Sequence, residues 1–76
     1  MPLSMCRIGS SVVVKDLNVD EALFKRLSSM GLIKGALLKI VSTEHHGPMT
    51  IELLGSQLAL GYEIASQIQV MTAKYH

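Results

Sequence analysis

The stretch RLSSMGLIKGALLKIV, residues 26–41, joins the end of an expected helix to the start of an expected strand, and it decides the fold. Apolar residues at the helical spacing of i, i+4 and i+7 lead into it, at Leu23, Leu27 and Met30. They predict one short amphipathic helix over about residues 20–30. Gly31 follows where helices commonly end in a left-handed residue, and Gly35 supplies the same conformation to the next turn. Alternating apolar residues after Gly35 indicate a strand.

Short runs rich in aliphatic residues recur along the rest of the chain, separated by glycines. With the strand above, they predict five strands, over residues 10–17, 36–43, 50–54, 57–60 and 68–71. Residues 62–67 are long enough for only a turn or so of helix. Gly55 and Ser56, between the third and fourth strands, have the sequence of a tight type II′ hairpin.

The order of these elements predicts a mostly β fold, a small five-stranded barrel with one short α-helix. Closure of the barrel would remove exposed sheet edges, which so short a chain has little material to cover. We expect a single domain over residues 1–76, with its core over about residues 8–71. In the first strand Val12 and Val14 are expected to face inward, and the opposite register, with Val13 and Leu17 inward, competes.

Composition narrows the classes of function. Cys6 is the only cysteine, so an internal disulfide is excluded and a reducing, cytoplasmic setting is favoured. The net charge is +1, from scattered residues without a basic stripe, which argues against nucleic-acid binding. No apolar run approaches the ~20 residues of a membrane helix, and the N-terminus lacks the pattern of a signal peptide. Phosphate-binding loops and nucleophile motifs are absent as well, so we expect no enzymatic activity.

Two adjacent histidines raise the question of a metal site. Glu44, His45 and His46 lie just before Gly47-Pro48, between two expected strands. Neighbouring side chains on a strand point to opposite faces, but in a loop the three could converge on one ion. A structural zinc site uses four ligands, usually including cysteine. We therefore interpret the segment as a solvated loop without a cofactor, with weak or adventitious divalent-metal binding as the alternative.

Some aliphatic residues do not fit inside a barrel of this size. By alternation, Leu37, Val41 and Leu54 fall on the outer face of the central strands, with Ile64 near its end and Lys39 at its rim. Aliphatic clusters on the surface of small soluble domains commonly mark docking sites. We predict a partner-binding surface here. Cover by the helix or the N-terminal segment, or pairing in a homo-oligomer, are the alternatives.

The chain resembles the FeoA family, small proteins of ferrous iron uptake in bacteria and archaea. The resemblance covers about residues 8–71, and the matching positions are Arg26, Leu27, Met30, Gly31, Leu32, Gly35, Leu38, Ile40, Gly55, Leu58, Ala59, Leu60, Ala65, Ile68 and Val70. The chain departs from the family pattern where Lys34 replaces a proline, where Gly47 directly precedes Pro48, and where Gly61 replaces a basic residue. The resemblance implies an SH3-like barrel that has no catalytic activity.

The same resemblance implies a partner. Members of the family are thought to bind the cytoplasmic part of FeoB, the GTP-hydrolysing transporter of ferrous iron, so contact with the membrane would be through that partner alone. The alternative is the SH3-like regulatory domain found at the C-terminus of DtxR-type iron-dependent repressors. No helix-turn-helix pattern precedes the first expected strand, which favours a free-standing protein.

Overall fold

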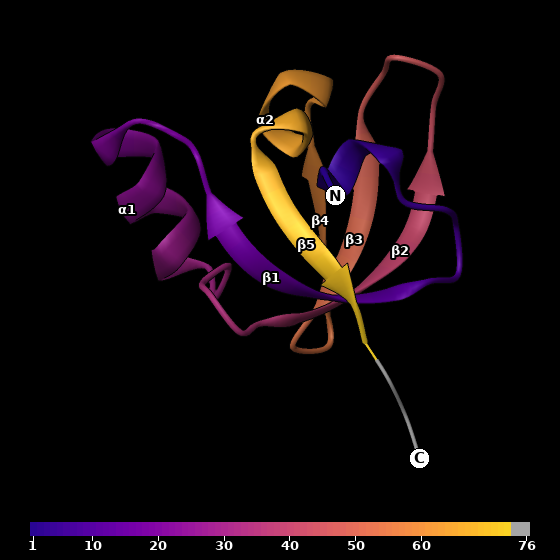
Figure 1. Ribbon diagram of the computed structural model, residues 1–76, viewed down its shortest axis with the longest axis horizontal. Coiled ribbons are helices and arrows are strands. Elements are labelled where there is room, and N and C mark those ends of the chain that lie inside the picture. The colour runs from indigo at the N-terminus through magenta and orange to yellow at the C-terminus, as the bar shows by residue number, and fades with distance from the viewer. Residues whose placement is uncertain (74–76) are drawn as a thin grey trace.

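The computed structural model describes residues 1–73 and confirms a mostly β fold, in which two short α-helices and one 3-10 helix accompany the strands (Figure 1). Its elements, in chain order, are the 3-10 helix η1 (Leu3–Met5), β1 (Ser11–Leu17), α1 (Glu21–Ser29), β2 (Leu37–Thr43), β3 (Met49–Leu53), β4 (Ser56–Leu60), α2 (Tyr62–Ser66) and β5 (Ile68–Thr72). All five expected strands, the helix and the helical turn are therefore present. None of the described helices is both long and apolar enough to cross a membrane.

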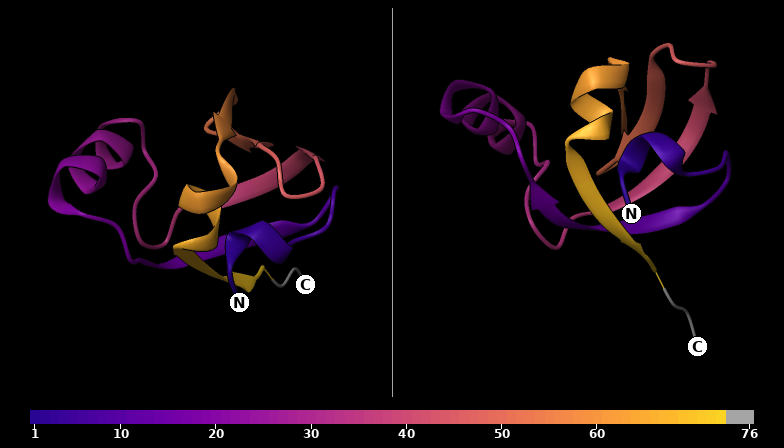
Figure 2. Two further views of the ribbon diagram at one scale, coloured as in Figure 1. Left: turned by 90° about the horizontal axis from the view of Figure 1, so that it is seen from above. Right: turned by 45° about the horizontal axis from the view of Figure 1, so that its top comes forward.

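The five strands form one antiparallel sheet in the order β4-β3-β2-β1-β5. The sheet curls on itself, α2 lies above the gap between its two end strands, and α1 lies to one side (Figures 1 and 2). This is the expected SH3-like barrel, but backbone pairing does not close it. Within the described residues β4 pairs only with β3, and β5 with β1 and a short N-terminal bridge. The expectation that closure removes both edges was therefore wrong for β4.

The first strand follows the expected register over its first half and changes it near its end. Val12 and Val14 face the core as expected, whereas Val13 is not among the buried core residues, and Leu17 is buried as in the competing register. The pairing of β1 with β5 shifts between Val14 and Asp16, so one extra residue is accommodated there. Such a β-bulge reverses the alternation of the residues that follow it. Three large side chains thus reach the core from one strand.

Helix α1 is closed at both ends by local hydrogen bonds. At its start the Asp20 carboxylate accepts a hydrogen bond of 2.8 Å from the backbone N–H of Leu23. At its end Gly31 has a φ of +92°, and its N–H donates to the carbonyl of Ser28 at 3.0 Å. The N–H of Leu32 donates to the carbonyl of Leu27 at 3.0 Å, which completes a Schellman motif. The cap directs Leu32 into the core, where it is fully buried.

The N-terminal segment belongs to the core, which therefore begins before the expected boundary at residue 8. Leu3 is fully buried and Cys6 nearly so. Pro2 forms an isolated bridge with Gln69, and the carbonyl of Met1 accepts a hydrogen bond of 2.8 Å from the N–H of Val70. This segment consequently fills the barrel with Leu3 and covers the outer edge of β5.

The turn between β3 and β4 differs from its sequence-based assignment. Leu53 pairs with Ser56, so the two central residues of the turn are Leu54 and Gly55. Both have positive φ, +53° and +80°. That combination is typical of a type I′ turn, whereas the expected type II′ turn would have been centred on Gly55 and Ser56. Gly55 is a turn glycine as expected, but Leu54 shares the left-handed conformation.

Gly31→Val should destabilise the domain by about 2 kcal/mol or more, because a β-branched residue is strained at positive φ. A Cβ at this position would also lie 3.0 Å from Leu54 Cδ1. Urea unfolding followed by circular dichroism measures the change. The matched control is Gly61→Ala, since Gly61 has a φ of −63° and open space around it. Equal stability of the two variants would show that the left-handed cap does not support the fold.

Candidate partner-binding groove and histidine pocket

An open apolar groove of about 510 Å³ lies between the α1–β2 connection and the β3–β4 turn. We call it the hairpin groove, and the residues that line it are Gly31, Ile33, Lys34, Gly35, Ala36, Leu37, Leu53 and Leu54. Both glycines have positive φ, so the connection bends sharply and leaves the groove open. Leu53 closes the floor and belongs to the core, whereas Ile33 and Leu37 are about half exposed.

Leu54 is the most unusual residue of the hairpin groove. Its side chain is 85% exposed, more than any other large apolar side chain among the described residues. Its φ of +53° is rare for a residue with a Cβ and disfavours leucine by about 1 kcal/mol relative to glycine or asparagine. Neither burial nor backbone preference therefore accounts for a leucine here. Backbone strain of this kind is commonly found at functional sites.

Charged residues border the apolar surface on two sides. Lys34 Nζ lies 3.8 Å from Asp16 Oδ1, in an exposed pair that contributes little to stability. Lys39 of β2 and Glu52 of β3 are directly opposite each other in the sheet. They line a smaller depression of about 260 Å³ that shares Leu37 and Leu54 with the hairpin groove. A partner seated on the two leucines would therefore meet charges of both signs around them.

The structure brings together three of the five residues expected to bind a partner. Leu37, Lys39 and Leu54 line adjoining depressions. Val41 lies where the pairing of β2 with β3 shifts, and it does not line the hairpin groove. Ile64 packs partly buried against the core. The sequence analysis did not identify Ile33 as a residue of this surface. An aliphatic side chain in a segment expected to be a turn could have indicated it.

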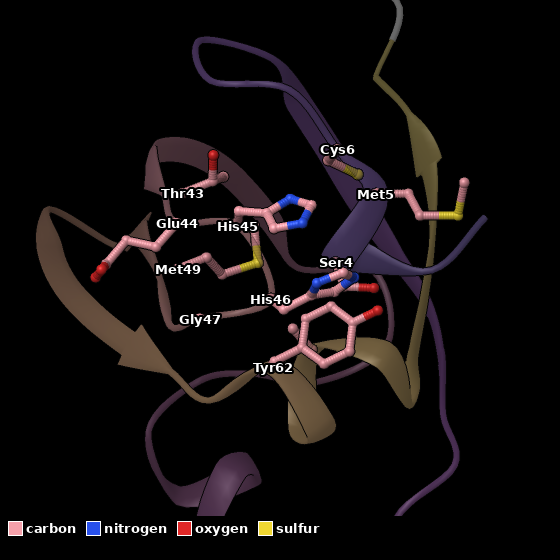
Figure 3. A pocket seen from close by; sticks show the side chains of 11 residues that line it. Ser4, Met5, Cys6, Thr43, Glu44, His45, His46, Gly47, Met49 and Tyr62 are labelled. Atoms are coloured by element: carbon pink, nitrogen blue, oxygen red, sulfur yellow. The ribbon is translucent and has the colours of Figure 1, made fainter.

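The histidines lie in the β2–β3 loop and point into a second pocket, of about 450 Å³ (Figure 3). The rings of His45 and His46 are 4.1 Å apart between centroids, and His46 packs edge-on against Tyr62 at 5.2 Å. His46 has a φ of +54°, which removes the strand alternation that would have separated the two rings. The loop thus brings the imidazoles together, whereas the carboxylate of Glu44 points away from them (Figure 3).

This pocket offers few metal ligands. Among residues 1–73 there is no group of three or more His, Cys, Asp or Glu side chains placed to hold an ion. Cys6 lines the same pocket, but burial raises the pKa of its thiol, against a smaller opposing effect of the N-terminal ammonium. A raised pKa disfavours the thiolate, which is the form that binds metals and acts as a nucleophile. Two imidazoles provide half of the ligands that a structural zinc ion requires.

The fold and the hairpin groove define the class of the protein: a small SH3-like domain with an exposed apolar surface. Residues 1–72 match the model of the FeoA domain, so the chain belongs to the FeoA family. A relative from Methanocaldococcus jannaschii, named "Putative Fe(2+) transport protein A", is 35% identical over 74 residues, which are 97% of this chain and 89% of the relative. The family comprises accessory proteins of ferrous iron transport.

Solved structures agree with the family assignment. The solution structure of the FeoA protein from Chlorobium tepidum superposes with a TM-score of 0.89 at 28% identity, over 97% of this chain and 71% of that one. A manganese-dependent transcriptional repressor in complex with manganese has a TM-score of 0.87 at 21% identity, over 96% of this chain but only 36% of the repressor. The second likeness shows a shared fold alone.

Leu54→Asn should raise the free energy of unfolding by about 0.5–1 kcal/mol, because asparagine tolerates the left-handed conformation and little buried area is lost. The same substitution at Leu37, which has ordinary strand geometry, is the control and should be neutral or destabilising. Chemical denaturation of both variants provides the comparison. A clear loss of stability in Leu54→Asn would assign the leucine to the core rather than to a binding surface.

Proposed function

We propose that the protein is a non-enzymatic accessory factor of ferrous iron uptake that acts in the cytoplasm by docking on the cytoplasmic region of the FeoB transporter. Two findings support a role in ferrous iron uptake: the chain belongs to the FeoA family, and one relative is named as an Fe(2+) transport protein. The hairpin groove supports the mode of action. The observation on which the proposal rests is Leu54, an exposed leucine held in a conformation that leucine disfavours.

Chemistry of the groove favours binding over catalysis. Its lining is apolar apart from backbone groups and the ammonium of Lys34. Lys34 is the single titratable side chain among the described residues that line it, so an acid–base pair does not form there. Apolar side chains in a concave surface, bordered by charges, are the usual anatomy of a protein-binding site, with the anchors near its centre. Leu37 and Leu54 are the candidate anchors because they are exposed and belong to both adjoining depressions.

An effect on transport requires that docking be selective. A protein that binds every state of a GTPase equally well cannot shift its cycle, whatever the affinity. We expect the groove to bind one nucleotide state of the transporter more tightly than the others. The alternative is a regulatory role within a DtxR-type repressor, and the fold shared with manganese-dependent repressors supports it.

Leu37→Asp combined with Leu54→Asp should weaken binding to the isolated cytoplasmic region of FeoB about tenfold or more, because two carboxylates would have to lose water on an apolar surface. Calorimetric titration with GTP, with GDP and without nucleotide measures the affinity. The matched control places aspartate at Ile8 and Met71, which are also half exposed or more but do not line the groove.

The control variant should retain the affinity of the unmodified protein, and both variants should keep its circular dichroism spectrum. Equal affinity of the groove variant and the control would place the binding surface elsewhere. Failure of the unmodified protein to bind FeoB in any nucleotide state would reject the partner itself. In that case, binding to the DNA-binding part of a DtxR-type repressor tests the alternative.

A further inference from the structure

The two end strands of the sheet, β4 and β5, differ in whether their outer edges are covered. The outer edge of β5 is covered by the N-terminal segment, through the bridge of Pro2 to Gln69 and the hydrogen bond between Met1 and Val70. The outer edge of β4 has no such cover among the described residues, which pair β4 with β3 alone. An open edge offers a row of unpaired backbone groups to any strand that approaches it.

The register identifies which groups on β4 are available. Leu53 and Ser56 flank a two-residue turn, so they form a hydrogen-bonded pair. Bonded and non-bonded pairs alternate along an antiparallel ladder, so Leu58 and Leu60 also bond to β3. Gln57 and Ala59 therefore direct their N–H and C=O groups outward. Neither residue takes part in the backbone hydrogen bonds made by the turns and loops.

The composition of β4 does not protect this edge. Its sequence, SQLAL, contains no charged residue and no proline. Charged side chains, prolines and bulges are the devices by which natural sheets prevent edge-to-edge pairing. Here the pairing of β4 with β3 is regular over all five residues of the strand, with no bulge. The edge is thus suited to accept another strand.

We propose that the occupant of this edge is β4 of a second copy of the chain, in an antiparallel pair about a two-fold axis at Leu58. In this register Gln57 lies opposite Ala59 of the second copy, and Ala59 opposite Gln57. These are the two residues with outward-facing groups, so both pairs exchange two hydrogen bonds each. Leu58 meets its own counterpart in the intervening non-bonded pair, where side chains approach most closely.

The symmetric arrangement follows from the covered edge of β5. Pairing of β4 with β5 of another copy would generate a ring or an open filament, as head-to-tail contacts do. That contact would have to displace Met1 and Pro2 from Val70 and Gln69. Pairing of β4 with β4 uses the open edge of each copy, so assembly stops at the dimer. A net charge of +1 per chain adds little repulsion.

The space beside β4 agrees with a modest interface. A groove of about 300 Å³ separates the first half of the strand from Met30 at the end of α1, which is 42% exposed. Gln57 and Leu58 line this groove, so this half of the edge borders open space. Five residues from each copy bury less than the ~800 Å² per partner of an interface of standard size. We therefore expect a reversible dimer that forms at high protein concentration.

Paired charge substitutions test the register. Gln57→Lys with Ala59→Lys places like charges opposite each other in both pairs, whereas Gln57→Lys with Ala59→Glu places opposite charges there. Sedimentation equilibrium between about 10 µM and 1 mM should show the unmodified chain rising from 8.3 kDa towards twice that mass. The double-lysine variant should dimerise about tenfold more weakly, and the lysine–glutamate variant as well as the unmodified chain or better.

Two controls separate this register from other effects. Lysines at Ile8 and Met71 add the same charge away from β4 and should leave the dimer intact. Ala59→Pro removes an outward N–H without breaking a bond to β3 and should abolish the dimer while the unfolding midpoint persists. A monomer at every concentration overturns the proposal. Equal weakening by both paired variants, or a dimer insensitive to Ala59→Pro, assigns any association to another surface.

Discussion

Burial of aliphatic side chains within a strongly curled sheet is the constraint on which the rest of the structure depends. All sixteen buried core residues are apolar or cysteine, and no polar or charged residue is buried among those described. Without a disulfide, a chain of 76 residues depends mainly on this packing to offset the entropy of folding. The connections must therefore return each strand to the core within a few residues. Left-handed turns at Gly31, Gly35 and Gly55 do so.

Leu54 is an exception to both of these patterns. It adopts the left-handed conformation although it is not glycine, and it is exposed although it is apolar. A fold selected for stability alone would place asparagine or glycine there. Its side chain instead stands beside Gly31, where an added Cβ would lie 3.0 Å from Leu54 Cδ1. The helix cap and the hairpin turn thus shape one surface together. This spatial link between two turns that are distant in sequence is what makes the groove a candidate site.

The sequence predicted every strand and both helices, because apolar periodicity and capping residues act locally. It did not reveal features that depend on distant parts of the chain. Leu3 enters the core from a three-residue 3-10 helix, which has no detectable period. Val41 was expected on the binding surface, but a shift in strand pairing removes it from the alternation. Alternation correctly predicted that Leu37 and Leu54 are exposed, although the exposure of Leu54 results from its position in the turn.

The β3–β4 hairpin contributes to both proposed interfaces, since Leu53 and Leu54 line the hairpin groove and β4 begins two residues later. A ligand that orders this short turn would also order the start of the β4 edge. If binding at the groove and pairing at β4 are coupled through this turn, the coupling is reciprocal. A partner that bound the dimer more tightly than the monomer would then promote dimerisation, and dimerisation would raise the affinity for that partner to the same degree.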